Sequence, residues 1–377
     1  MQKLIIFFIL FCLKFSEAST LTDFRLTPKT DAIFKLEEIL PNKLHYPWGM
    51  TFIDKQNLLI TEKSGRIVKF NILSKELVDI EHSINYVKYR NKNFALRQGG
   101  LLDILSHNKE LFFSYSHGET FKYSGTAIAK GKLKENRIVD LKVLLTAKPK
   151  GSINKHWGSR ILIKNDKLYA GFGERDLGMI AQDPSKHPGS VVRINLDGSV
   201  PLDNPAFKNR PDWLPEIFQI GVRNPQGISL SPHNGDIYIS QHGARGGDNI
   251  SKVEYAGNLG WKLTGWGGTE YSGVKIGKTS FDDRFDEQLI TWVPSIGLGN
   301  IDFYSGDKFS EWNGDLIYSA TKEELLGKIK LEGNKITKNE LILSGEIGRI
   351  RDFEIHESGE IFIITDKKNG SIWRLSR

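Results

Sequence analysis

Residues 227–253 read GISLSPHNGDIYISQHGARGGDNISKV, and this stretch indicates a β-fold. Three short runs, 227–230, 236–239 and 250–253, combine β-branched residues with the apolar–polar alternation that is typical of β-strands. A turn at 232–235 separates the first two runs, and a glycine-rich loop at 242–248 precedes the third. The stretch therefore predicts a three-stranded unit whose loop lets a ligand approach the backbone closely.

The same order of strand, turn, strand, loop and strand returns six times along the chain. Each unit again begins with a short run that follows glycine or polar residues, and its second run is the most apolar of the three. The expected strands are 48–52, 58–61 and 66–70; 100–104, 111–114 and 125–129; 158–162, 167–170 and 190–194; 227–230, 236–239 and 250–253; 301–304, 315–318 and 327–331; and 351–355, 360–364 and 371–375.

Repeats of roughly 50–70 residues with several strands each indicate a β-propeller, because one such unit cannot bury both of its faces alone. We therefore predict an all-β, six-bladed β-propeller in which residues 19–377 form a single domain. The segment around 34–39 is expected to supply the outer strand that closes the last blade. A β-sandwich is the alternative fold, but the sixfold return of one pattern argues against it.

The first 18 residues have the pattern of a cleaved signal peptide. Lys3 precedes an apolar run at 4–15, and small residues end the segment at Ala18, after which we expect cleavage. A membrane anchor is the alternative, but the run is shorter than the roughly 20 residues of a membrane span. The only cysteine, Cys12, lies in this segment, so the mature chain is expected to have no disulfide and to be periplasmic or secreted.

The charge pattern indicates a small acidic ligand rather than nucleic acid. The net charge is +7, and the basic residues are scattered among acidic ones without an arginine-rich tract. No glycine loop stands between a strand and a helix in the way that NAD binding requires.

Polar residues precede the first strand of several units and should meet at one mouth of the central channel. Those that precede first strands include one histidine, several amides and four arginines, and we expect such cations, without carboxylates nearby, to need a bound anion. The segments concerned are 97–100, 154–158, 223–227 and 348–351, together with 241–244 and 319–322, which follow second strands.

The chain resembles the soluble pyrroloquinoline-quinone (PQQ)-dependent aldose sugar dehydrogenases, the soluble glucose dehydrogenase-like family. The motifs that carry the resemblance occur in family order, which is far more specific than propeller repeats alone. They are PWGMTF (47–52), RQGGLLDI (97–104), HWGSR (156–160), GVRNPQGI (221–228), QHGARGGDNI (241–250) and GRIRDF (348–353).

The resemblance implies an oxidoreductase that converts aldose sugars to lactones and passes electrons to an external acceptor. His156 matches the general base, and Arg223 with Asn224 matches the pair that polarises the quinone. The further positions that the resemblance assigns to PQQ binding are Gln98, Tyr271, Thr321, Lys322, Arg349 and Arg351.

The resemblance also implies calcium, held by the backbone carbonyls of Gly243 and Ala244. Asn249 and Leu259 match metal positions of an accessory calcium, but the family usually has Glu and Tyr there, and Pro in place of Ala244. Two rivals stay open: a metal-dependent lactonase, which would need several converging carboxylates, and a non-catalytic propeller that has lost its cofactor.

Overall fold

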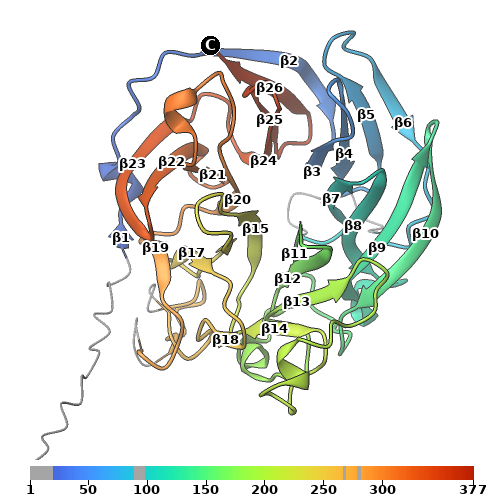
Figure 1. Cartoon of the computed structure of the whole chain (residues 1–377), viewed down its shortest axis with the longest axis vertical. Helices are drawn as coiled ribbons and strands as arrows, with labels where there is room; N and C mark the ends of the chain where they lie inside the picture. Colours follow the sequence, from blue (N-terminus) through green and yellow to red (C-terminus); the bar gives the residue numbers. More distant parts are fainter. Residues whose placement is uncertain (1–19, 89–97, 266–268, 278–281) are drawn as a thin grey trace, which may run out of the picture.

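The computed structural model describes residues 20–88, 98–265, 269–277 and 282–377. Six sheets stand around a central channel, which confirms the predicted six-bladed β-propeller (Figure 1). The predicted signal peptide and Arg97 lie outside the described residues. Among the described residues, no helix has both the length and the apolar character to cross a bilayer.

Each blade has four or five strands, and the innermost strand of a blade comes before its middle strands in the chain. Two strands of the N-terminal segment are added at the outer edges of two blades. Blade 1 contains β3 (Pro47–Phe52), β4 (Asn57–Glu62), β5 (Ile67–Asn71) and β6 (Leu77–Ile80). Blade 2 contains β7 (Leu101–His107), β8 (Glu110–His117), β9 (Gly125–Lys134) and β10 (Arg137–Thr146). Blade 3 contains β11 (Gly158–Lys164), β12 (Lys167–Phe172), β13 (Ser190–Asn195), β14 (Ile217–Ile220) and β18 (Gly257–Asn258).

The second half of the ring follows the same plan. Blade 4 contains β15 (Pro225–Leu230), β16 (Ile237–Gln241), β17 (Asp248–Lys252), β19 (Gln288–Trp292) and β1 (Thr20–Thr22). Blade 5 contains β20 (Leu298–Phe303), β21 (Leu316–Ala320), β22 (Leu325–Glu332) and β23 (Lys335–Ser344). Blade 6 contains β24 (Ile350–Ile355), β25 (Ile361–Thr365), β26 (Gly370–Ser376) and β2 (Lys35–Leu44). Short 3₁₀ helices lie at η1 (Phe24–Leu26), η3 (Phe121–Tyr123), η4 (Gly178–Gln182), η5 (Pro205–Phe207) and η6 (Ser310–Trp312).

The ring is closed by the N-terminal strand, as the sequence predicted. Strand β2 pairs antiparallel with β26, placing Leu36 opposite Leu375 and Glu38 opposite Trp373. The blade that holds the C-terminus therefore takes its outer strand from the start of the chain (Figure 1). This pairing covers the edge that β26 would otherwise expose.

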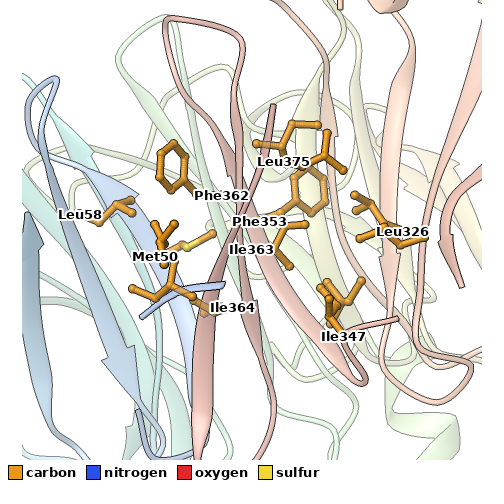
Figure 2. Packing of buried hydrophobic residues seen from close by; sticks show 14 of the residues in the cluster. Met50, Leu58, Leu326, Ile347, Phe353, Phe362, Ile363, Ile364 and Leu375 are labelled. Atoms are coloured by element: carbon orange, nitrogen blue, oxygen red, sulfur yellow. The ribbon is translucent and has the colours of Figure 1, made fainter. Parts of the chain in front are cut away.

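The core lies between neighbouring blades, and its largest part joins blades 5, 6 and 1. Figure 2 shows Met50 and Leu58 of blade 1 on one side of blade 6 and Leu326 of blade 5 on the other. The middle strand β25, with the sequence IFIIT, is buried at every residue because both of its faces are covered.

Deeper in the channel, the side chain of Arg160 connects four blades. Its Nη1 donates to Asp103 Oδ1 (2.8 Å) and to Asp352 Oδ2 (2.9 Å), and its Nε donates to the carbonyl of Gln226 (2.8 Å). Burial raises the pKa of Asp103 to about 6, against the lowering effect of Arg160. These bonds between inner strands fix the spacing of the loops above them.

Candidate active site

Two adjoining cavities lie at the channel mouth where the sequence predicted a site. The larger has a volume of about 590 Å³ and the deeper one about 300 Å³, and both are lined by Gln98, His242, Thr321 and Arg349. A still larger hollow of about 850 Å³ lies at the outer edge of the ring between segment 30–35 and blade 5. None of the sequence-predicted site residues line it, so the convergent polar groups at the mouth mark the better candidate.

The structure brings the predicted base and the predicted cofactor residues to these two cavities. His156, Arg223, Tyr271 and Lys322 line the larger cavity, and Asn224 and Arg351 line the deeper one; Gln98, Thr321 and Arg349 line both. They come from five different blades, which explains why they lie so far apart in the sequence.

His156 stands two residues before β11 and is held on two sides. Its backbone N–H donates to Gln98 Oε1 (2.7 Å), and its Nδ1 lies 2.5 Å from Oε1 of Glu174. Glu174 is buried, and its other oxygen accepts from the N–H of Gly178 (2.7 Å). Because an ionised carboxylate only accepts, the ring proton is assigned to Nδ1, which leaves Nε2 with a free lone pair.

Arg223 and Asn224 stand immediately before β15. The Arg223 guanidinium donates to the carbonyl of His242 (3.2 Å), lies 3.5 Å from Glu270 Oε2, and stacks 4.9 Å from the ring of Trp261. The Oδ1 atom of Asn224 accepts from the N–H of Gly158 (3.1 Å), which ties blades 3 and 4 together at the site. Both side chains are therefore fixed in place before any ligand arrives.

A carboxylate lies among the cations, which corrects the expectation that none would. Asp366 Oδ2 lies 2.5 Å from Arg351 Nη2 and 3.4 Å from Arg349 Nη2, and its Oδ1 lies 3.4 Å from Lys63 Nζ. Burial acts to raise the pKa of Asp366, but the charges of Arg351, Lys63 and Arg349 outweigh it and lower the pKa. Three cations to one carboxylate still leave positive charge, and a ligand with carboxylate groups fits it.

Lys63 was missed by the sequence reasoning, as were Glu174 and Asp366, whereas His242 was expected at the mouth within segment 241–244 but was given no role. Burial lowers the pKa of the Lys63 ammonium, and the charge of Asp366 opposes this. Burial likewise lowers the pKa of His242 to about 4, against the opposing charge of Asp248, so this imidazole is neutral at pH 7. His242 lines both cavities, and its signal in the sequence was its place directly after a second strand.

Thr321 and Lys322 are anchored by backbone carbonyls, and Tyr271 is more open. Thr321 Oγ1 donates to the carbonyl of Gly297 (3.0 Å), and Lys322 Nζ donates to the carbonyl of Ser295 (3.0 Å). Tyr271 is 64% exposed on the rim of the larger cavity. A ligand seated there would cover its ring.

The loop proposed for calcium has the chemistry that a hard cation requires. Among the described residues, no hydrogen bond reaches the carbonyl oxygens of Gly243 and Ala244, and Gly243 lines the larger cavity. Buried Asp248 supports this loop: Oδ1 accepts from the N–H of Gly243 (2.8 Å), while Oδ2 accepts from Gly297 (2.7 Å). Unpaired carbonyls beside an acidic group fit Ca²⁺.

A second group, His156, Glu174 and Asp176, offers ligand atoms within 4.8 Å of one another. These atoms already have partners, since His156 bonds to Glu174 and Asp176 lies 3.2 Å from Lys155 Nζ. The arrangement is therefore that of a histidine hydrogen-bonded to a buried carboxylate.

Comparison with known proteins identifies the family. A family model described as glucose/sorbosone dehydrogenase matches residues 44–374. The chain belongs to this family. Aldose sugar dehydrogenase YliI of Escherichia coli (strain K12) is 30% identical over 353 residues, which cover 90% of this chain and 92% of that protein.

Solved structures agree with this membership of the glucose/sorbosone dehydrogenase family. The apo-form of the soluble aldose sugar dehydrogenase from Escherichia coli superposes with a TM-score of 0.84 at 29% identity, covering 91% of this chain and 99% of that one. The PQQ-bound aldose sugar dehydrogenase from Streptomyces coelicolor gives a TM-score of 0.72 over 92% of this chain and 98% of that one, and its 20% identity shows the common fold alone. The resemblance found in the motifs is confirmed at the level of the family.

Proposed function

We propose that this protein is an exported, PQQ-dependent dehydrogenase that oxidises the anomeric carbon of aldose sugars to lactones. Its family and the aldose sugar dehydrogenase among its relatives support a sugar oxidoreductase. The observation that carries the proposal is the bond between His156 and the buried Glu174, because His156 lines the same cavity as Arg223 and Lys322. A base and a cationic wall in one cavity suit the removal of a proton beside an anionic cofactor.

His156 takes the proton of the anomeric hydroxyl on Nε2. As that O–H bond breaks, the hydride leaves C1 and the C1–O bond becomes the carbonyl of the lactone. Glu174 holds the proton on Nδ1 and stabilises the imidazolium that forms. When bound, PQQ supplies the two-electron acceptor for the hydride.

The cations of the deeper cavity would hold the cofactor. Arg349, Arg351 and Lys63 bring positive charge that Asp366 only partly balances, and arginine pairs with a carboxylate through two parallel hydrogen bonds. Arg223 and Asn224 would direct N–H donors at the oxygen where negative charge develops. Gln98, Thr321, Lys322 and Tyr271 complete the walls of the larger cavity.

Calcium would be held at the carbonyl oxygens of Gly243 and Ala244. These oxygens supply only part of a coordination shell, so oxygens of the cofactor and water would complete it. Calcium and quinone are then expected to bind together rather than independently.

Export is part of the proposal and rests on the leader-like pattern of residues 1–18. An external electron acceptor would regenerate the cofactor after each turnover. The mature protein would act in the periplasm or outside the cell.

The test is a titration of purified quinone-free protein with PQQ and Ca²⁺ while aldose-dependent dye reduction is followed. We expect saturable, calcium-dependent activity, and His156→Gln should still bind the quinone while turnover falls about 10²–10⁴-fold. Quinone binding without turnover on any aldose would point to another substrate. If no quinone bound, the proposal would be wrong and a non-catalytic propeller would be favoured.

A further inference from the structure

A buried chain of side-chain amides joins Arg223 to the loop between β16 and β17. The backbone N–H of Arg223 donates to Gln241 Oε1 (2.8 Å), and Gln241 Nε2 donates to Asn249 Oδ1 (3.2 Å). Asn249 Nδ2 then donates to the carbonyl of Gly247 (2.8 Å). The loop that carries Gly243 and Ala244 is thus connected to the polarising arginine through protein atoms alone.

The same bonds occupy the oxygen of Asn249 that a metal would need. Asn249 Oδ1 accepts from Gln241 Nε2 and also from Ser251 Oγ (2.7 Å), which uses both of its lone pairs. Its Nδ2 can only donate, and it points at the Gly247 carbonyl. Asn249 is therefore a poor ligand for calcium in this arrangement.

The space beside Asn249 is also unfavourable for a cation. A cavity of about 30 Å³ is lined by Asn249, Leu259 and the loop glycines. Two buried N–H groups on its lining residues, Arg223 Nε and Trp261 Nε1, find no acceptor among the described residues. N–H donors repel a cation, and the volume suits an ordered water molecule instead.

We infer that Asn249 is a positioning residue, which holds Arg223 and the 243–247 loop by hydrogen bonds. The family resemblance had implied an accessory calcium at Asn249 and Leu259 instead. The chain then binds one calcium, at the Gly243 and Ala244 carbonyls, and the loop is folded without a second one. The inference concerns the state of the loop, so it goes beyond the proposed function.

Calcium stoichiometry decides between one ion and two. We expect metal analysis of quinone-loaded protein, after exhaustive removal of free calcium, to give one calcium per chain. Two ions would overturn the inference. Should no quinone bind, the proposed function fails separately, and the count on quinone-free protein stays decisive: none or one agrees with the inference, and two contradicts it.

The positioning role is tested with Asn249→Ala and a matched control, Asn204→Ala. Asn204 is also buried and donates from Nδ2 to two carbonyls, of Arg193 (2.9 Å) and Pro215 (2.8 Å), at the outer part of blade 3. Both variants should unfold at lower temperature. Only Asn249→Ala should weaken quinone-dependent calcium binding in calorimetry, by about 10-fold, because it loosens the carbonyl loop. Equal calcium affinities in the two variants would overturn the role.

Discussion

Replacing Glu174 with Gln tests how the proposed base is held. In the protein, Glu174 uses one oxygen for His156 Nδ1 (2.5 Å) and the other for the N–H of Gly178 (2.7 Å). A glutamine keeps the shape of the side chain, and the Gly178 N–H retains its only oxygen. The glutamine NH₂ group therefore faces His156 Nδ1.

Placing a donor in front of Nδ1 changes which imidazole nitrogen of His156 carries the proton. Nδ1 must now accept from the glutamine NH₂ group, so the proton moves to Nε2 and the lone pair that takes the sugar proton is lost. The buried carboxylate that stabilises the imidazolium is lost as well. The comparable exchange in a Ser-His-Asp triad costs about 10⁴-fold. We expect about 10²–10³-fold in kcat, or roughly 3–4 kcal/mol, because the glutamine is free to adjust.

The assay is steady-state dye reduction at saturating quinone and calcium, together with quinone affinity measured separately. Glu174→Gln should lower kcat and leave quinone affinity within about twofold, since Glu174 is not among the residues lining either cavity. Glu216→Gln is the matched control, because Glu216 Oε2 pairs with His187 Nε2 (3.3 Å) in the same blade and away from the site. If Glu174→Gln kept kcat within about threefold, the assignment of His156 as a base held by Glu174 would be refuted.

Two further predictions concern stability. Burial raises the pKa of Asp302 to about 6, above its ordinary 3.8, so the folded state binds this proton more tightly and the stability contribution of Asp302 falls as pH rises from about 4 to 6. Asp302→Asn should therefore raise the free energy of unfolding in urea by about 3 kcal/mol at pH 8 and by almost nothing at pH 4, and an equal effect at both values would contradict this. Ile363 is fully buried in the core of Figure 2, so Ile363→Ala should cost about 2–5 kcal/mol in the same assay and Ile363→Val about 0.5–1.5, with kcat unchanged in both; a loss of kcat would show that this core supports the site directly.

The three inner strands of each blade could be predicted from the sequence, but of the outer strands only β2 could be. Inner and middle strands such as β25 bury both faces, so their apolar runs are continuous and easily recognised. Strands β10 and β23 lie at the rim, where charged residues alternate with apolar ones and much of each strand is exposed. Their pattern resembles that of polar loops, which is why the fourth strand was not predicted in the other units.

The residues of the site likewise fall into those that the sequence predicted and those that it did not. Residues that precede the inner strands, such as His156 and Arg223, were found because the propeller fold directs those loops to the mouth. The residues missed, Lys63, Glu174 and Asp366, all follow middle strands, and only two segments of that kind had been considered. Among them, Asp366 partly balances the charge of Lys63, Arg349 and Arg351.

The registers of the hairpins explain why preceding and following residues meet. Gly158 lies opposite Phe172, and two residues further out on each strand stand His156 and Glu174, the proposed base and its carboxylate. Ile350 lies opposite Thr365, and one residue further out on each strand stand Arg349 and Asp366. An antiparallel hairpin therefore places each partner at the same end of one blade.

The same relation holds in two further blades. Pro47 lies opposite Glu62, and next to that pair Lys63 Nζ stands 4.9 Å from the ring of Tyr46. Pro225 lies opposite Gln241, and next to that pair Asn224 Nδ2 approaches His242 Nδ1 at 3.4 Å. Four of the blades thus bring a pair of side chains that are already in contact within one hairpin. The ring has to set these pairs around the channel, and Arg160 with its buried carboxylates fixes that spacing from below.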